Sequence, residues 1–374
     1  MNSLDRYILK QCLIPFLLAI AIVTTIVWMT QSLQRAEILV EYSQGFGVFA
    51  WLSLLIVPSL LAVIVPFALF AAALYTLQRL HADSEIAVMF AAGVSKLRIG
   101  APFLLLAFVG AAATLWVNLD LMPRSYRLLK REVADIRADF ASAVLRGGEF
   151  VTLSDGFTVY VEEVRPGGQL VGLLINDYRR SGGTETYMAQ RGLLRDTPQG
   201  PVLYLANGNV QRVARYTGVV EFVRFQETAI NITDFDQRGG DLQLELTERY
   251  LPELFNPDRE NAWDRENARI LKAEGHNRLA SPLYAFAYVL IAIYALIGGA
   301  YTRRGYGTRI AIACAAAGGV RVAGFLLQSL AGETGSYWVI YFAPALIIVF
   351  LGALLTDSAR IPSRRARHKK ARRL

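Results

Sequence analysis

The chain has 374 residues, of which 54% are hydrophobic and 19% are charged. Typical soluble domains have about 45–50% apolar and about 25% charged residues. The apolar excess is concentrated in long charge-free runs, which excludes an ordinary soluble enzyme. The net charge is +8, yet residues 123–277 carry 20 Lys/Arg and 23 Asp/Glu. The basic excess therefore lies beside the apolar runs, where it orients a membrane protein and does not indicate nucleic acid.

Six segments are long and apolar enough to cross a bilayer, because a hydrocarbon core about 30 Å thick needs roughly 20 apolar residues in a helix. They lie at about 13–30, 48–77, 99–119, 279–300, 310–330 and 335–355. The second contains Pro58 and Pro66, so it can tilt or kink, and the fifth contains one charge, Arg321. The first does not resemble a cleavable signal peptide, because polar sequence precedes it and no small-residue cleavage site follows.

The Lys/Arg content of the short loops predicts the orientation of these spans. The N-terminal segment and the loops after spans 2 and 4 are richer in Lys/Arg than the loops after spans 1 and 5. The tail from Arg360 has eight Lys/Arg and no acid, which suits contact with anionic lipid. This alternation predicts six spans with both termini in the cytoplasm. The alternative, six buried helices of a soluble protein, is disfavoured because hydropathy and charge agree.

The polar middle of the chain, residues 123–277, is predicted to lie outside the cytoplasm. It begins as a charged helical continuation of span 3, and near Glu149 the apolar period changes to two. Short alternating segments such as FVTLSDGFTVYVEEV and PVLYLANGNVQRV follow at even intervals between turn residues. Such spacing is typical of a sandwich, barrel or jelly roll. From residue 257 to residue 278 the pattern becomes helical again.

The predicted fold class is therefore membrane α-helical, with six transmembrane helices arranged 3+3 and an inserted extracytoplasmic, all-β, jelly-roll-like domain. The predicted parts are transmembrane helices 1–3, the β-domain with flanking helical segments, transmembrane helices 4–6 and a basic cytoplasmic tail. Their boundaries are 1–122, 123–277, 278–357 and 358–374.

Several chemical signatures are missing from the sequence. No Gly-Lys dipeptide occurs, so there is no Walker A loop for ATP. The histidines, His81, His276 and His368, are far apart and lack metal-ligand spacing. No G-x-S-x-G nucleophile elbow occurs, and the spans contain almost no acids for a proton relay. We therefore predict a non-catalytic protein with no cofactor and no metal, whose energy for any uphill process comes from a partner.

The loop between spans 2 and 3 reads LQRLHADSEIAVMFAAGVSKLRI. Asp83 or Ser84 can cap a helix, Glu85 falls in its first turn and Gly93 can end it, while Ser95 can cap span 3. We predict a helix of about two turns at 84–92 on the cytoplasmic face.

This short helix has more apolar residues than a solvated turn needs. They are Ile86, Val88, Met89 and Phe90. Either they pack against the membrane surface or the chain's own spans, or the helix docks on a cytoplasmic partner with Glu85 facing an arginine.

The segment SEIAVMFAAGVSK resembles the signature of the lipopolysaccharide export permeases, the LptF/LptG family: Ser-Glu-(Ile/Leu)-x-Val-Met-x-(Ala)-x-Gly-(hydrophobic)-Ser. The resemblance continues along the chain. LDRYILKQ precedes span 1, Pro58 and Pro66 lie eight apart in span 2, and AEGHNRLASPLYAF enters span 4. The isoleucine after Glu85 is more similar to LptF than to LptG.

This resemblance implies a permease subunit of an ABC transporter in the bacterial inner membrane, with its β-domain in the periplasm. It implies a heterodimer with an LptG-like paralogous permease, driven by an LptB-like ATPase dimer. The heterodimer would extract lipopolysaccharide from the membrane and pass it to LptC-like and LptA-like bridge proteins. By motif position, Glu85 would be the acidic contact. The implied ATPase-coupling residues are Ser84, Glu85, Ile86, Val88, Met89 and Gly93.

Two arginines are candidate lipopolysaccharide ligands. Arg35 lies at the outer end of span 1, where the family tends to place basic residues facing phosphates; alternatively it extends to the interface. Arg321 lies near the middle of span 5, where a charge costs at least a few kcal/mol. It therefore lines a lipid cavity or pairs with a carbonyl or acid of the partner permease.

Two further alternatives stay open at this stage. The small residues of span 5 suit either the heterodimer seam or packing within the chain. The apolar strand residues form either a closed core or a groove for acyl chains. These strand residues are Phe150, Phe157, Val159, Leu203, Leu205, Phe222 and Phe225.

A membrane-anchored periplasmic scaffold without transport activity is the alternative function. Six spans and a charge within the membrane exceed what an anchor needs. An intramembrane enzyme acting on lipids is disfavoured by the scarcity of carboxylates and histidines.

Overall fold

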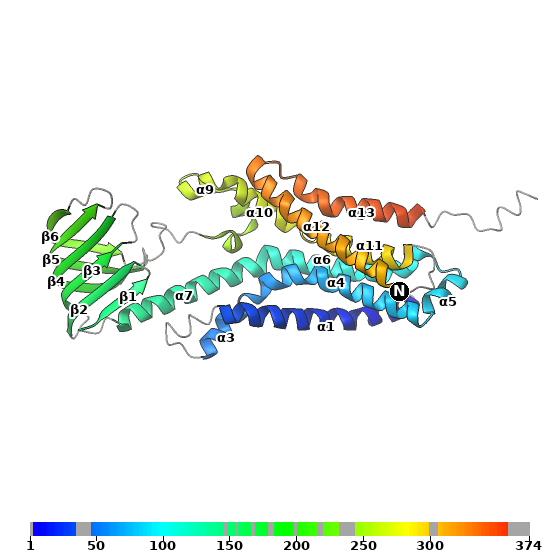
Figure 1. The fold of residues 1–374 in the computed structure, drawn as a ribbon, viewed down its shortest axis with the longest axis horizontal. Helices are drawn as coiled ribbons and strands as arrows, with labels where there is room; N and C mark the ends of the chain where they lie inside the picture. The colour runs from blue at the N-terminus through cyan, green and yellow to red at the C-terminus, as the bar shows by residue number, and fades with distance from the viewer. Residues whose placement is uncertain are drawn as a thin grey trace, which may run out of the picture. The chain divides into compact units, whose positions relative to one another are not determined.

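We analysed a computed structural model of the chain. The described residues are 3–34, 46–144, 148–154, 156–165, 169–178, 183–197, 200–214, 220–231, 244–298 and 306–357. The chain divides into a helical unit, built from the sequence up to Leu128 and from Glu245 onward, and a unit between Leu129 and Leu244 that contains the sheet. Figure 1 shows the elements of both units.

The helical unit is assembled from two stretches of sequence. Before the sheet they are α1 (Ser3–Gln34), α3 (Phe46–Leu54), α4 (Val57–Ala82), α5 (Glu85–Ala91), α6 (Lys96–Trp116), the π-helical turn η1 (Val117–Leu121) and α7 (Met122–Val144), which continues beyond this unit. After the sheet they are η3 (Leu246–Glu248), α8 (Leu251–Phe255), α9 (Ala262–Glu266), α10 (Ala268–Ala280), α11 (Leu283–Ile293), the π-helical turn η4 (Tyr294–Gly298), α12 (Gly307–Thr334) and α13 (Val339–Asp357).

Within the described residues, five helices are long and apolar enough to cross a membrane, and six if the bent pair α10–α11 is one span. The predicted six-span helical fold is thereby confirmed. Span 3 is longer than predicted, because the helix passes through η1 without a break and forms a continuous segment from Lys96 to Val133. Span 4 is bent by 46° between α10 and α11, where Pro282 lacks the N–H that a straight helix would use.

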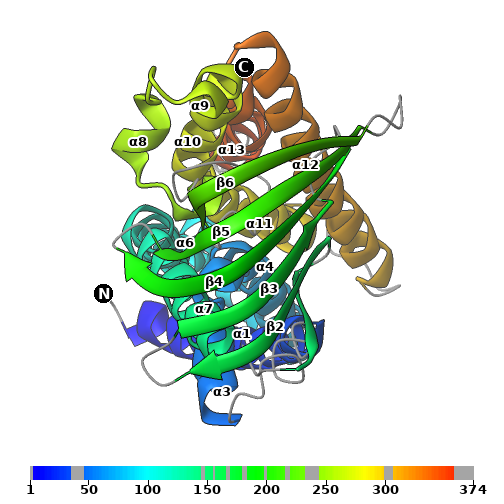
Figure 2. The ribbon, with the colours of Figure 1, turned by 90° about the vertical axis from the view of Figure 1, so that its left-hand side faces the viewer.

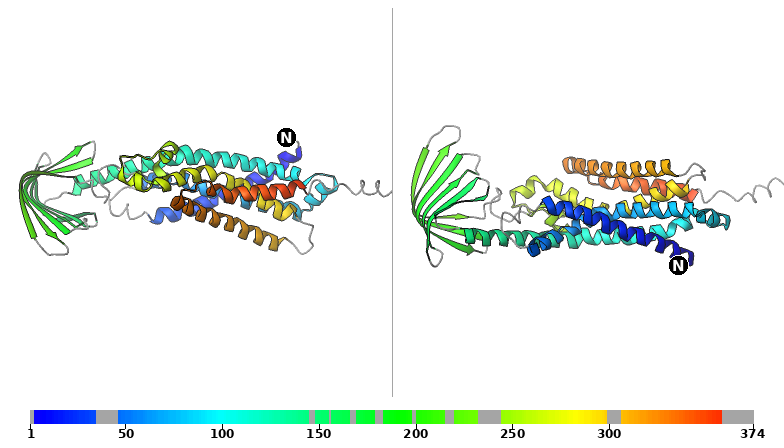
Figure 3. Two further views of the ribbon diagram at one scale, coloured as in Figure 1. Left: turned by 90° about the horizontal axis from the view of Figure 1, so that it is seen from above. Right: turned by 60° about the horizontal axis from the view of Figure 1, so that its bottom comes forward.

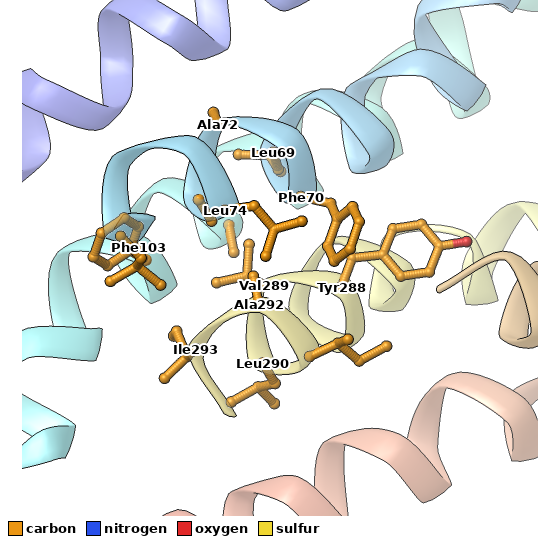
Figure 4. Close-up of a cluster of buried hydrophobic side chains, with 14 of the residues drawn as sticks. Leu69, Phe70, Ala72, Leu74, Phe103, Tyr288, Val289, Leu290, Ala292 and Ile293 are labelled. Carbon is orange, nitrogen blue, oxygen red and sulfur yellow. The ribbon is translucent and has the colours of Figure 1, made fainter. Parts of the chain in front are cut away.

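The core of the helical unit lies where α4 and α6 meet α11. Figure 4 shows Leu69 and Phe70 of α4, Phe103 of α6 and Val289 of α11 in one cluster, and these side chains are buried. The helices approach closely at Gly110, where a Cβ atom would lie 2.7 Å from Leu69 Cδ1. The first and second sets of spans are therefore held together by a shared apolar core.

The two ends of the helical unit carry different elements. The start of α1, the short helix α5 and the end of α13 lie at one end, which we call the α5 end (Figures 1 and 3). Helix α9 lies at the opposite end, which we call the α9 end. The first and last spans therefore begin and end on the same side as α5.

The sheet unit contains six antiparallel strands, as an inserted all-β domain requires. They are β1 (Phe150–Ser154), β2 (Phe157–Arg165), β3 (Gln169–Asp177), β4 (Gly183–Thr197), β5 (Gly200–Ala214) and β6 (Val220–Asn231). Their order in the sheet is their order in sequence, and Figure 2 shows them side by side. The described strands thus form a meander without the crossover connections of a complete jelly roll.

One face of the curved sheet (Figure 3) is apolar. The structure divides the apolar strand residues named from the sequence into two groups. Those buried in one cluster, with Phe225 packed against it, are Phe157, Val159, Leu203 and Leu205. By contrast, Phe150 and Phe222 are each 68% exposed.

A buried polar network fixes the chain at the α9 end. Arg249 donates two hydrogen bonds of 2.6 Å to the carboxylate of Asp264, and the two side chains are only 7% and 3% exposed. Arg278, fully buried, donates to the carbonyls of Leu246 and Arg249 at 2.7 Å each. The hydrogen bonds from Arg249 hold the pKa of the Asp264 carboxyl below its ordinary value.

Replacing Asp264 with Asn is expected to destabilise the protein by about 3 kcal/mol, because the buried Arg249 would lose the charge of the carboxylate that accepts two of its hydrogen bonds. Thermal unfolding of the detergent-purified protein measures this. The stabilisation from Asp264 is complete above its unfolded-state pKa of about 4 and is lost as the pH falls through the lower folded-state pKa. Exposed Glu260, changed to Gln, is the matched control. If Asp264→Asn and Glu260→Gln lowered thermal stability equally, the Arg249–Asp264 pair would not be a specific source of stability.

Candidate functional site

Helix α5 is a two-turn helix with defined ends. Ser84 occupies its N-cap with φ of 57°, in the left-handed region, and makes no side-chain capping hydrogen bond. At the other end Gly93 has φ of 83°, and its N–H donates to the carbonyl of Phe90 while that of Val94 donates to Met89. These two bonds form a Schellman motif. The predicted two-turn helix ending at Gly93 is confirmed.

The flanking residues complete the segment. Ser95 accepts a hydrogen bond from the Arg98 N–H and so caps α6, as predicted. Asp83 does not cap α5; its carboxylate lies 3.7 Å from Arg79 on α4. The turn before α5 is therefore formed by the left-handed backbone conformation of Ser84 and not by a side-chain cap.

The two faces of α5 have different surroundings. Ile86 and Met89 are buried in the core of the helical unit. Val88 lies on the other side of the helix and is 66% exposed, and we call this side the outer face of α5. Phe90, at the edge of the buried side, is 38% exposed. Packing on the chain's own spans therefore holds for Ile86 and Met89, whereas docking of the exposed side on a partner stays a prediction.

Glu85 is held by a residue from the first span. The Tyr7 hydroxyl donates to Glu85 Oε1 at 2.8 Å, and Gln11 Nε2 donates to the Tyr7 hydroxyl at 2.6 Å. Both partners lie on α1, one helical turn apart. The carboxylate that the sequence motif singles out is therefore joined to α1 as well as to α5.

Two cationic or polar groups on either side of α5 bind the end of span 4. His81 Nε2 lies 2.8 Å from the Leu296 carbonyl oxygen, and Lys96 Nζ donates to the Gly298 carbonyl at 2.9 Å. The last carbonyls of a helix lack partners within the helix and favour positive charge nearby. His81 and Lys96, which lie before and after α5 in sequence, thus join this segment to the second set of spans.

Sequence reasoning did not identify Tyr7, His81 or Lys96. Tyr7 was part of the quoted motif LDRYILKQ, but no local pattern relates it to Glu85, which lies 78 residues away. The separation of His81 from Leu296 is 215 residues. Only the folded chain brings these groups together.

Arg321 lies at the contact between α11 and α12. Its guanidinium carbon is 5.2 Å from the ring centre of Tyr284 and 4.3 Å from that of Phe325. Its Nε is buried and has no hydrogen-bond partner among the described residues. The aromatic faces stabilise the cation partly and leave hydrogen-bonding capacity for another group.

The backbone of α12 allows Tyr284 to approach Arg321. A Cβ atom at Gly324 would lie 1.9 Å from the Tyr284 hydroxyl, so only glycine fits there. The other predicted substrate residue, Arg35, lies outside the described residues.

The sheet carries a hollow of about 780 Å³. Its lining includes Leu173, Ala189, Gly208 and Phe225, which pair with one another across β3 to β6 and so share one face of the sheet. The Phe225 ring lies over Gly208, where a Cβ atom would be 2.5 Å from Phe225 Cζ, so only glycine fits there. Among the described residues, no group of three or more His, Cys, Asp or Glu side chains is placed to hold a metal ion.

Comparison with known proteins agrees with this architecture. Residues 6–357 match the family described as lipopolysaccharide export system permease LptF/LptG. An uncharacterized protein of Rickettsia prowazekii, RP871, is 22% identical over 95% of this chain and 99% of its own length. The lipopolysaccharide export system permease protein LptF of Escherichia coli K12 is 26% identical over 48% of this chain and 53% of its own length. The same values hold for LptF of Shigella flexneri.

The chain thus spans about half the length of the LptF proteins that it matches, whereas the family match covers nearly all of it. The apolar spans, the inserted antiparallel sheet and this family match agree with one another. The chain is an inner-membrane protein and belongs to the LptF/LptG family of lipopolysaccharide export permeases.

Proposed function

We propose that the chain is a permease subunit of an ABC transporter that extracts lipopolysaccharide from the inner membrane and passes it to a periplasmic bridge. The observation that carries the proposal is the two-sided packing of α5: one face is fixed to the spans and the other is open. An LptB-like ATPase dimer supplies the energy, since the sequence has no Walker A loop. The other partners are an LptG-like permease and LptC-like and LptA-like bridge proteins.

We place the α5 end in the cytoplasm and the sheet in the periplasm. The short loops rich in Lys/Arg support this orientation, and the first and last spans begin and end beside α5 (Figure 1). The domains are then 1–122, 123–277 and 278–357, with residues 358–374 as a cytoplasmic tail; that tail lies outside the described residues.

Within α5 we assign different roles to the motif residues. Glu85 and Val88 contact the ATPase, Glu85 through an arginine of that subunit. Ile86 and Met89 carry the motion of α5 to the spans because they are buried among them. The backbone conformations of Ser84 and Gly93, both with positive φ, set the ends of the docking helix.

Glu85→Lys and Val88→Asp are each expected to abolish co-purification of the ATPase with the permease, because each places a wrong charge in the interface. Val88 is 66% exposed, so the thermal stability of the isolated Val88→Asp permease should stay the same. Met89→Asp, by contrast, is expected to lower stability, because it buries a charge.

Glu260→Lys is the control for charge reversal, since Glu260 is exposed near the α9 end. A complex that forms normally with both Glu85→Lys and Val88→Asp would show that α5 is not the docking helix.

We further propose that Arg321 binds an anionic group of lipopolysaccharide, with Arg35 as a second contact. Support comes from the buried Nε without a hydrogen-bond partner in the described part of the chain, together with the apolar surroundings of Arg321. A planar guanidinium suits phosphate, whose oxygen pairs it can bind together.

Arg321→Leu is expected to lower ATP-driven release of lipopolysaccharide from proteoliposomes by about tenfold, the effect of losing one hydrogen bond to a charged group. Arg321→Lys should retain part of the activity. The neighbouring substitution Val322→Leu is the control, because Val322 is exposed and apolar. Transport at the normal rate in Arg321→Leu would remove the proposed role.

The hollow on the sheet has an amphipathic lining. It combines the apolar side chains of Leu173 and Phe225 with polar ones, among them Asn209, Arg224 and Gln226. We propose that lipopolysaccharide passes over this face on its way to the bridge proteins.

A further inference from the structure

Glu85 and Tyr7 form a contact that the docking role of Glu85 does not require. The Tyr7 hydroxyl and Glu85 Oε1 are 2.8 Å apart, and Gln11 extends the chain of hydrogen bonds along α1. We propose that Tyr7 is the positioning residue of Glu85: it holds one carboxylate oxygen and leaves the other toward the ATPase. This inference rests on the proposed function of Glu85.

The direction of each hydrogen bond follows from the chemistry of the three groups. An ionised carboxylate only accepts, so the Tyr7 hydroxyl must give its proton to Glu85. The hydroxyl oxygen then accepts, so Gln11 must present its NH2 group and not its carbonyl. Only this orientation of the Gln11 amide gives the Tyr7 hydroxyl a donor, although it leaves Gln11 Oε1 buried without a hydrogen-bond partner among the described residues. Gln11 thereby orients the Tyr7 hydroxyl.

The turn of α1 that carries Tyr7 and Gln11 is packed against the core. Ile8 and Cys12, which flank Tyr7 and Gln11 in sequence, are buried in the core of the helical unit. They fix the cytoplasmic turn of α1 against α4. Helix α5 itself has only seven residues, and a helix of that length is marginal without tertiary contacts. Tyr7, on the long helix α1, therefore holds the side chain of Glu85, the first residue of the short helix α5.

A fixed carboxylate lowers the cost of docking. A free glutamate side chain has several rotamers, and immobilising it in an interface opposes binding. With Oε1 already held, Glu85 is ordered before the partner arrives. Tyr7→Phe removes only the hydroxyl and retains the ring, so it tests this contribution directly.

The experiment measures the affinity of the purified ATPase of the same transporter for the full-length permease pair in nanodiscs. The variants are Tyr7→Phe, Glu85→Gln and the double substitution. Tyr7→Phe is expected to weaken binding about fivefold, and Glu85→Gln more strongly. Because Tyr7 acts through Glu85, adding Tyr7→Phe to Glu85→Gln should weaken binding no further. Tyr75→Phe is the control, since Tyr75 lies on α4 and is 54% exposed.

The outcomes separate the inference from the proposal on which it rests. Normal binding by Glu85→Gln would refute the docking role itself. Weak binding by Glu85→Gln with normal binding by Tyr7→Phe, or with fully additive losses, would refute only the positioning role of Tyr7. If Tyr7→Phe fails to fold, Gln11→Met decides, because it removes the donor that orients the hydroxyl. It should weaken binding in the presence of Glu85 and have no effect in Glu85→Gln.

Discussion

Span 4 has irregular backbone at its bend and at its last turn, and each irregularity leaves carbonyl groups for which lipid offers no hydrogen bond. At the α5 end, the π-helical turn η4 ends against His81 and Lys96, which belong to the first set of spans. At the bend, Ser281 Oγ donates to the Arg278 carbonyl, which Pro282 cannot serve, and Asn118 of η1 donates to the Ser281 hydroxyl. Between these points α4 and α11 share an apolar core (Figure 4). The requirement to satisfy polar backbone thus ties the two sets of spans together on either side of that core.

The same arrangement determines what a displacement of α5 can move. Its inner face packs on the spans, Tyr7 joins Glu85 to α1, and the residues before and after the helix join it to η4. A force on the outer face would therefore reach both sets of spans at once. An ATPase docked there would act on the whole α5 end of the subunit and not on one helix alone.

Local patterns predicted the elements well, whereas contacts between distant residues could not be predicted. The apolar runs gave the spans, and the Ser-Glu motif with Gly93 gave α5, because hydropathy and helix caps are local properties. The bend at Pro282 and the π-helical turns depend on packing partners, so span 4 differs from the prediction. Arg321 was singled out from its depth alone, but its stacking on Tyr284 required the fold. The Tyr7–Glu85 contact joins residues that no sequence period relates.

The strand order of the sheet has a consequence for biosynthesis. Every pairing among the described strands joins consecutive strands, so contact order is low and the sheet is able to form as soon as β6 has been synthesised. The packing of α4 on α11, by contrast, has high contact order, because the whole sheet lies between these two helices in sequence. The apolar surface of α4 that packs on α11 is therefore completed only after the whole sheet has been synthesised.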